Sequence, residues 1–198
     1  MPSFFFFKGG YKIQNNTRIA LFIDGGYLDE LLKKFNMARI DYNKLTKKLA
    51  QDHDLLRTYY YHCLPFQSSQ PTPEESEKFS RAQKFFKKLN QLDSFTVREG
   101  KLAFRGINDE GLPIYEQKRV DVMLATDLVM HSTKRLITHA SILTGDSDFL
   151  PAIEIAQSEG VHITLFYCHE LPPHDELLDK VDARRVIDED MINSIKRN

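Results

Sequence analysis

The sequence of 198 residues lacks several features that mark whole classes of protein. Its two cysteines, Cys63 and Cys168, are too few for a disulfide framework. No apolar run reaches the roughly 20 residues that a membrane-spanning helix needs. The four phenylalanines at positions 4–7 are too few for the apolar part of a signal peptide, and no small-residue cleavage site follows them. We therefore expect a protein of the cytoplasm that does not engage a membrane.

The sequence also has no strong excess of either charge. The formal net charge is -1, which argues only weakly against nucleic-acid binding, because acids gathered at a metal site offset basic residues elsewhere. Each basic cluster fits a solvated helix face as well as a nucleic-acid surface. The clusters are Lys44, Lys47 and Lys48; Arg81, Lys84, Lys87 and Lys88; Lys118 and Arg119; and Lys134 and Arg135.

Several common catalytic and cofactor motifs are absent. The sequence contains no Walker loop, no Rossmann glycine fingerprint and no nucleophile elbow. His62 with Cys63, and Cys168 with His169, are the pairs that suggest zinc. Adjacent residues of a strand point to opposite faces, and neither pair has the usual two-residue spacing between ligands. The sequence therefore weighs against a zinc site.

What is present is a chain long enough for one packed domain, which we expect to span residues 17–198. Residues 1–16 differ in composition and are expected to form an N-terminal appendage. Such a segment can add an edge strand, cover a groove, or mediate self-association into a homo-oligomer.

From residue 18 onward, apolar runs and amphipathic stretches alternate. Strands are expected at 18–23, 55–62, 142–144 and 161–167, and helices at 27–35, 42–50, 120–130, 149–158 and 188–195. Residues 65–73 are expected to form a loop, and Thr72-Pro73-Glu74-Glu75 then predicts a capping box that begins another helix. Residues 95–98 and 102–104 resemble a hairpin that turns at Glu99-Gly100, and residues 108–111 a turn. Alternating elements of this kind predict an α/β fold with a central, mainly parallel sheet and helices on both faces.

Acidic residues follow two of the predicted strands. The first strand ends in Asp24-Gly25-Gly26, and the strand at 142–144 is followed by Gly145, Asp146 and Asp148. The carboxyl ends of parallel strands meet at one edge of a sheet, where open α/β folds bind ligands. Carboxylates placed together repel one another unless a cation lies between them. We therefore predict a divalent-metal site at this edge.

Each acid also has a structural explanation. Asp24 and Asp148 can cap helices that follow them, and Asp121 can stabilise the first turn of the helix at 120–130. Asp146 has the weakest structural explanation of these, because it lies at the strand tip. Asp127 lies about 120° around the same helix from Asp121, on the apolar side, so it needs a buried partner and cannot share one ion with Asp121.

Three segments together resemble the NYN domains of the LabA-like branch of the PIN-domain-like nucleases. They are residues 22–26, residues 118–128 and residues 143–149, and they occur in the family's order and spacing. The resemblance covers about residues 18–167. It implies a three-layer, PIN-like (Rossmann-like) fold and a Mg²⁺- or Mn²⁺-dependent ribonuclease. Many family members have an asparagine two or three residues after the first aspartate, where this chain has Gly26 and Tyr27.

By position, the resemblance makes Asp24, Asp121 and Asp146 metal ligands, Asp148 a ligand or the holder of a metal-bound water, and Asp127 a supporting residue. The expected reaction is hydrolysis of an RNA phosphodiester bond. Lys118 or Arg119 would hold a flanking phosphate. Tyr27 would either stack on a base or belong to the core.

Two other functions compete with this hypothesis. An aspartyl-nucleophile phosphatase of the haloacid-dehalogenase kind requires a second acid two residues after the first, and Gly26 occupies that position. A non-catalytic module that binds RNA or a nucleotide would keep the fold without cleaving its ligand. The presence of all the acids favours the enzyme over this module.

Overall fold

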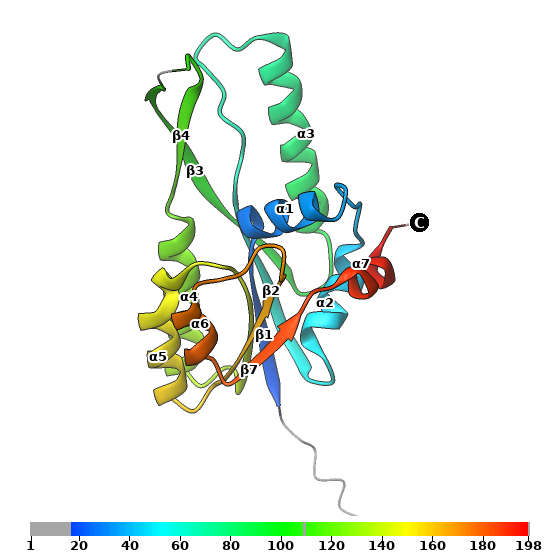
Figure 1. Cartoon of the computed structure of the whole chain (residues 1–198), viewed down its shortest axis with the longest axis vertical. Coiled ribbons are helices and arrows are strands. Elements are labelled where there is room, and N and C mark those ends of the chain that lie inside the picture. Colours follow the sequence, from blue (N-terminus) through cyan, green and yellow to red (C-terminus); the bar gives the residue numbers. More distant parts are fainter. Residues whose placement is uncertain (1–16, 109, 198) are drawn as a thin grey trace, which may run out of the picture.

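The computed structural model describes residues 17–108 and 110–197, which build an α/β structure around one sheet (Figure 1). The expected N-terminal appendage, residues 1–16, lies outside the described residues. The seven described strands lie in the order β4-β3-β2-β1-β5-β6-β7. They are β1 (Arg18–Asp24), β2 (Asp54–Cys63), β3 (Phe95–Ile107), β4 (Pro113–Lys118), β5 (His139–Leu143), β6 (His162–Tyr167) and β7 (Ala183–Val186). Neighbouring strands are parallel, except for the antiparallel pair β3 and β4.

Helices cover both faces of the sheet, so the three-layer α/β prediction is confirmed. One buried cluster joins the sheet to α1 (Gly25–Lys34), α2 (Tyr42–Ala50), α3 (Pro73–Leu89) and α7 (Glu189–Ile195). The other joins it to α4 (Val120–Thr133), α5 (Leu150–Ser158) and α6 (Asp175–Lys180). In Figure 1, α4, α5 and α6 lie on one side of the sheet, and α2 and α7 on the other. No helix within the described ranges is long and apolar enough to cross a membrane.

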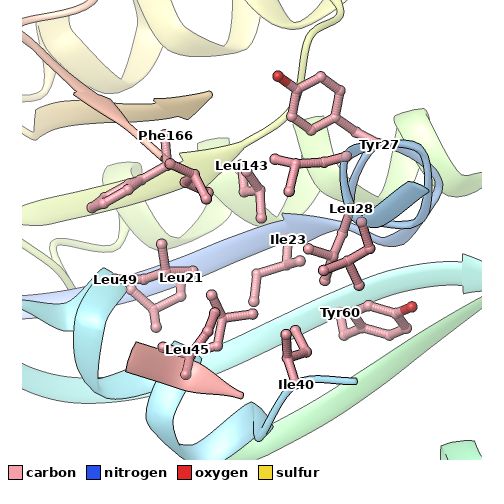
Figure 2. Packing of buried hydrophobic residues seen from close by; sticks show 14 of the residues in the cluster. Leu21, Ile23, Tyr27, Leu28, Ile40, Leu45, Leu49, Tyr60, Leu143 and Phe166 are labelled. Carbon is pink, nitrogen blue, oxygen red and sulfur yellow. The ribbon is translucent and has the colours of Figure 1, made fainter. Parts of the chain in front are cut away.

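Strand β1 shows why the sheet is covered on both faces. Ile19, Leu21 and Ile23 belong to the cluster under α1 and α2, whereas Ala20 and Phe22 belong to the cluster under α4 and α5. Figure 2 shows Leu21 and Ile23 packed with residues of α1 and α2. A continuous apolar run is what a strand buried on both faces requires.

The order of the strands places a switch point beside β1. The chain runs from β1 outward to β2 and β3, and then returns to the other side of β1 to form β5. Helices α1 and α5 leave the sheet after the carboxyl ends of β1 and β5, respectively. In open α/β sheets, the crevice between two such strands is where ligands bind. The predicted acidic residues follow these two strands.

The predicted hairpin across Glu99 and Gly100 is wrong. Strand β3 runs through both residues and reverses only after Ile107. Gly100 is required for packing rather than for a turn, because a Cβ atom there would lie 2.5 Å from Val120 Cγ2 and 2.8 Å from Cys63 Sγ. The reversal uses the turn that was expected at residues 108–111, where Asn108 Oδ1 accepts hydrogen bonds from the backbone of Glu110 and Leu112.

Other local predictions vary in outcome. The capping box of α3 is confirmed, with Thr72 and Glu75 exchanging side-chain and backbone hydrogen bonds. Strands β4 and β7 and helix α6 were not predicted. Every residue of β4 is exposed, so the strand shows no alternation of buried and exposed residues. Backbone pairing with β3, the Arg105–Glu116 ion pair and the contacts of the Tyr115 ring with Phe66 and Phe104 hold it.

Candidate active site

Asp24 ends β1 and lies at the switch point. Its Oδ1 atom accepts hydrogen bonds from the backbone N–H groups of Gly26 at 2.9 Å and Tyr27 at 3.1 Å, so it caps α1. Its Oδ2 atom accepts a hydrogen bond from the Thr144 hydroxyl at 3.2 Å. The structural explanation offered for Asp24 is therefore observed. Oδ1 is saturated by its two hydrogen bonds, but Oδ2 keeps one lone pair free, so the cap leaves capacity for a cation at Oδ2.

Asp146 follows β5 and forms a backbone hydrogen bond with Thr144, the residue that also contacts Asp24. Thr144 is fully buried, and its Oγ1 atom also accepts a hydrogen bond from the Asp146 backbone at 3.3 Å. Asp146 caps the short 3-10 helix Ser147–Phe149, because its Oδ1 atom accepts a hydrogen bond from the Asp148 backbone at 2.9 Å. The structural alternative for Asp148, capping of the helix that follows it, is not observed, because the N-cap residue of α5 is Phe149 and no side chain caps this helix. Asp148 is exposed, and its carboxylate makes no hydrogen bond within the part of the chain that the structure describes.

The loop between Thr144 and Asp146 is shaped by Tyr27. A Cβ atom on Gly145 would lie 2.7 Å from the Tyr27 ring. Tyr27 is only 9% exposed, and its hydroxyl donates a hydrogen bond to the Leu171 carbonyl at 2.7 Å and accepts one from the Cys168 backbone at 3.2 Å. Tyr27 is therefore a core residue that supports the loop. This burial favours the core assignment of Tyr27 over stacking on a base.

Asp121 reaches the site from α4. It lies in the first turn of the helix, two residues after Arg119, whose backbone is left-handed with a φ of 76°. A non-glycine residue in this region of conformational space is strained, and such strain concentrates at functional sites. Asp121 itself accepts no capping hydrogen bond within the described part of the chain, and its side chain is exposed.

The carboxylates influence one another electrostatically. Although Asp121 is exposed, partial shielding of its carboxyl group from water raises its pKa, and the negative charges of Asp24, Asp146 and Asp148 raise it further. Burial also raises the pKa of Asp24, and this effect outweighs the opposing hydrogen bonds from Tyr27, Thr144 and Gly26. None of the four acids forms an ion pair with a lysine or arginine of residues 17–108 or 110–197. Their combined negative charge is thus left without a cationic side chain.

This environment fits a divalent cation that keeps part of its water shell. Carboxylate oxygens are the ligands that Mg²⁺ and Mn²⁺ prefer, and Mg²⁺ usually retains several waters. Among the described residues, however, no three histidine, cysteine, aspartate or glutamate side chains stand in an arrangement that could hold a metal ion. The acids are therefore close enough to repel one another but do not form a closed cage. A cation here would rely on water and on substrate oxygens to complete its coordination.

Asp127 has the partner that its buried position requires, but it does not contact the other acids. Its carboxylate receives two hydrogen bonds from the Arg98 guanidinium, each at 2.9 Å, and one from the Tyr61 hydroxyl at 2.9 Å. Arg98 also lies over the Tyr59 ring, at 5.4 Å from its centre. The predicted supporting role is thus indirect, because Asp127 fixes α4, and with it Asp121, against β2 and β3.

The two predicted phosphate-binding residues lie just before Asp121 in the chain. Lys118 ends β4, Arg119 precedes α4, and both are exposed. Neither forms an ion pair within residues 17–108 and 110–197, so their role as phosphate ligands stays a prediction.

Sequence reasoning missed several polar residues near Asp24. His62 Nε2 lies 3.1 Å from Asp29 Oδ2, and the Gln117 side chain lies beside Gly26. Glu30 lines a hollow of about 400 Å³ together with Asp24 and Asp146. Asp29 and Glu30 could have been identified as residues near the site, because they lie in the first two turns of the helix that begins directly after Asp24.

The comparisons with known proteins agree with this architecture. A crystal structure of a protein of unknown function from Vibrio parahaemolyticus is similar over 89% of this chain and 96% of its own, with a TM-score of 0.60 and 17% sequence identity. The uncharacterized protein y4oD of Sinorhizobium fredii is 36% identical over 69 residues, which are 35% of this chain and 30% of that relative. The chain therefore covers less than a third of this relative's length. The NYN domain family matches residues 18–189, so the chain belongs to the NYN domain family, a group within a nuclease-like superfamily.

Proposed function

We propose that the protein is a divalent-metal-dependent ribonuclease of the LabA-like branch, acting on RNA with Mg²⁺ or Mn²⁺. The observation that carries the proposal is the mutual electrostatic influence of Asp24, Asp121, Asp146 and Asp148 at the switch point, with no cationic partner among residues 17–108 and 110–197. A structural cap explains two of these acids, Asp24 and Asp146. It explains neither Asp121 nor Asp148.

The residues of the site would have different roles in this hydrolysis. Asp24, Asp121, Asp146 and Asp148 would hold the cation, which when bound activates water and offsets charge on the phosphodiester. Thr144 and the start of α1 hold the Asp24 carboxylate in one orientation, so little reorganisation is needed when substrate arrives. Lys118 and Arg119 would bind a neighbouring phosphate. The RNA backbone would then lie across the carboxyl edge of the sheet.

The experiment is a cleavage assay on RNA of mixed sequence, in Mg²⁺, in Mn²⁺ and in EDTA. Wild-type protein should cleave only with added metal, and Asp121→Asn should be inactive. Asp93→Asn is the matched control, because Asp93 is exposed and lies just before β3, at the opposite edge of the sheet. Cleavage that continues in EDTA, or that survives Asp121→Asn, contradicts the proposal.

A second candidate is a module that binds RNA or a nucleotide without cleaving it. The observation in its favour is that no closed three-ligand metal arrangement exists in the described residues. It predicts that RNA binds equally well in EDTA and in Mg²⁺ and is recovered intact. The enzyme hypothesis predicts metal-dependent loss of the RNA in the same assay.

A further inference from the structure

A pocket of about 350 Å³ opens beside the acidic edge, between α1, β2, α3 and the β3–β4 hairpin. Its aromatic lining is Tyr42, Tyr60, His62, Phe85 and Phe86. The Tyr42 ring lies 5.8 Å from the Tyr60 ring and 5.5 Å from the Phe85 ring. Pockets of this size hold small planar ligands, and aromatic walls favour an aromatic occupant.

Two polar atoms at this pocket lack hydrogen-bond partners. The Tyr60 hydroxyl and His62 Nδ1 are both buried, and neither has a partner among residues 17–108 and 110–197. Tyr60 is completely buried, and its hydroxyl lies near the Tyr42 hydroxyl without making a well-aligned hydrogen bond to it. A buried polar group without a partner is costly and calls for an explanation. A ligand that hydrogen-bonds to these atoms supplies one.

The polar atoms also have defined chemistry. His62 Nε2 lies 3.1 Å from Asp29 Oδ2, so the ring donates its Nε2 proton to that carboxylate. In the neutral ring, Nδ1 is then an acceptor. The Tyr60 hydroxyl can donate or accept, and the Gln117 amide at the same pocket can do both. This mixture of donors and acceptors matches the edge of a nucleobase.

The pocket is next to the acids. Gly25, the residue after Asp24, lies against the Tyr60 hydroxyl, because a Cβ atom there would be 2.8 Å from it. A second hollow shares Asp29, His62 and Gln117 with the pocket and extends to Gly26. Gly26 also lines the hollow that contains Asp24 and Asp146. A ligand can therefore occupy the pocket and the acidic edge together.

We propose that this pocket binds one nucleobase of the RNA, held by the Tyr42, Phe85 and Phe86 rings and by hydrogen bonds to Tyr60, His62 and Gln117. The inference rests on the proposed function, because it assigns the base that flanks the phosphate at the acidic edge. Asp29, the acid that lines the pocket, is already paired with His62, so the pocket suits a neutral ring. Base stacking tolerates any base, whereas the polar atoms give a preference for one.

The test is binding of the four ribonucleoside 5′-monophosphates in EDTA, with ribose 5-phosphate as the probe that lacks a base. Titrations are followed by calorimetry or by NMR. Wild-type protein should bind at least one of the monophosphates and should not bind ribose 5-phosphate measurably. Absence of binding by all four, or equal binding of ribose 5-phosphate, overturns the proposal.

Three variants locate the bound base. Ala82 lines the pocket from α3, so Ala82→Leu should fill it and weaken binding about tenfold or more. Gln83→Leu adds an apolar side chain at the next, exposed position and should change affinity less than about twofold. Tyr60→Phe should also weaken binding about tenfold while leaving the apo melting temperature equal or higher, because it removes an unpartnered buried hydroxyl. Equal binding by all three variants overturns the proposal.

Ala82→Leu and the cleavage-deficient variant Asp121→Asn together separate this inference from the proposed function. If Asp121→Asn abolishes cleavage while monophosphate binding persists, both stand. If RNA is cleaved with metal but Ala82→Leu changes neither KM nor nucleotide binding, the ribonuclease stands and the base pocket fails. If RNA is never cleaved but Ala82→Leu still blocks nucleotide binding, the pocket stands and the ribonuclease fails.

Discussion

The Thr144 hydroxyl donates a hydrogen bond to Asp24 Oδ2 at 3.2 Å and accepts one from the Asp146 backbone at 3.3 Å. One fully buried side chain thus connects the tips of β1 and β5, the two strands that border the candidate site. The position of Asp24 relative to Asp146 therefore depends on this hydroxyl.

Replacing Thr144 by valine keeps the shape but removes both hydrogen bonds. We expect the free energy of unfolding to fall by about 1–3 kcal/mol, because buried groups lose their partner. The bond from Thr144 also lowers the pKa of Asp24 against the larger effect of burial. Its loss should raise that pKa and move the acid limb of any activity profile to higher pH.

Urea denaturation and the pH dependence of cleavage measure these two effects. Thr144→Ser is the control, since it retains the hydroxyl and loses only a methyl group. An unchanged pH profile in Thr144→Val, with normal activity, would show that the bond does not tune Asp24.

Neutralising Asp121 should separate stability from function. The pKa of Asp121 is raised above its ordinary value of 3.8 by burial and by three neighbouring acids. The folded state therefore holds this proton more tightly than the unfolded chain, so stability declines as pH rises from about 3.8 through the folded pKa. In EDTA at pH 7, Asp121→Asn removes this unfavourable charge but loses a helix-dipole contribution of about 0.3–1 kcal/mol.

We accordingly expect Asp121→Asn to melt within a few degrees of wild type in EDTA. Wild-type protein should gain melting temperature on addition of Mg²⁺ or Mn²⁺, and the variant should gain less. Melting curves with and without metal provide the measurement. Equal gains in both proteins would argue against Asp121 as a ligand.

The sheet and its acidic tips could be predicted because they depend on short-range patterns. The strand that ends at Asp24 is a continuous apolar run, and the run before Asp146 is similar, so both identify buried parallel strands. The residues of β4 carry no such pattern, since all are exposed and the strand depends on pairing with β3 and on contacts with distant residues. Glu99-Gly100 was predicted to be a turn because the sequence does not distinguish a glycine needed for close packing from a glycine needed for a positive φ.

The contacts of the site were harder to predict because they join distant segments. Asp127 and Arg98 are 29 residues apart, and Thr144 and Asp24 are 120 apart, so only the folded sheet brings them together. The sequence required a partner for Asp127 without identifying it. Asp146 acts as the cap because the backbone N–H group of Asp148 points toward its carboxylate, and no sequence pattern specifies the direction of that group.

The pair of Arg98 and Asp127 should hold α4 in place. The Asp127 side chain is 8% exposed and the Arg98 side chain 38%, so removing the arginine leaves a buried carboxylate with Tyr61 as its remaining partner. We expect Arg98→Met to cost about 2 kcal/mol in urea denaturation, less than for a fully buried pair because water reaches Arg98. The double variant Arg98→Met, Asp127→Asn should recover part of this loss. A double variant less stable than Arg98→Met would show that the carboxylate is not left uncompensated.

Substitutions at Asp146 should separate capping from catalysis. Asparagine and aspartate cap helices about equally well, whereas alanine cannot accept the hydrogen bond from the Asp148 backbone. Asp146→Asn should retain wild-type stability in EDTA, and Asp146→Ala should lose about 1 kcal/mol. Both should abolish metal-dependent cleavage if the charge holds the cation. Full activity in Asp146→Asn would reduce Asp146 to a structural cap.

A group of histidines at the opposite edge of the sheet should make the fold sensitive to acid. His139, at the start of β5, stacks on His53 with ring centres 4.1 Å apart and lies 5.4 Å from His162. Burial lowers the pKa of His139 below its ordinary value of 6.5, and the nearby His53 and His162 lower it further. His139 Nδ1 also lies 2.9 Å from the Thr138 hydroxyl, which donates its own proton to the Arg18 carbonyl and so can accept one from Nδ1 of the neutral ring.

The direction of the effect follows from the lowered pKa. Below about pH 6.5 the unfolded chain binds a proton at His139 that the folded protein resists, so stability falls as pH decreases from 6.5 through the folded pKa. Above pH 6.5 both states are neutral at this ring and the effect disappears. His131, whose pKa is lowered mainly by burial, acts in the same direction, so His139 carries only part of the acid sensitivity.

We expect His139→Gln to reduce the loss of unfolding free energy between pH 7.5 and pH 5, chosen to lie about one unit or more on either side of the ordinary histidine pKa. Urea denaturation at both pH values measures the difference, and comparing each variant with itself removes any constant packing cost of the substitution. His169→Gln is the matched control, because His169 is exposed and contacts only the Tyr167 ring among the aromatic residues described. The control should keep the wild-type pH dependence. If His139→Gln keeps it too, the stacked histidines stay neutral or share protons without cost, and the acid sensitivity must come from His131 and from groups elsewhere in the fold.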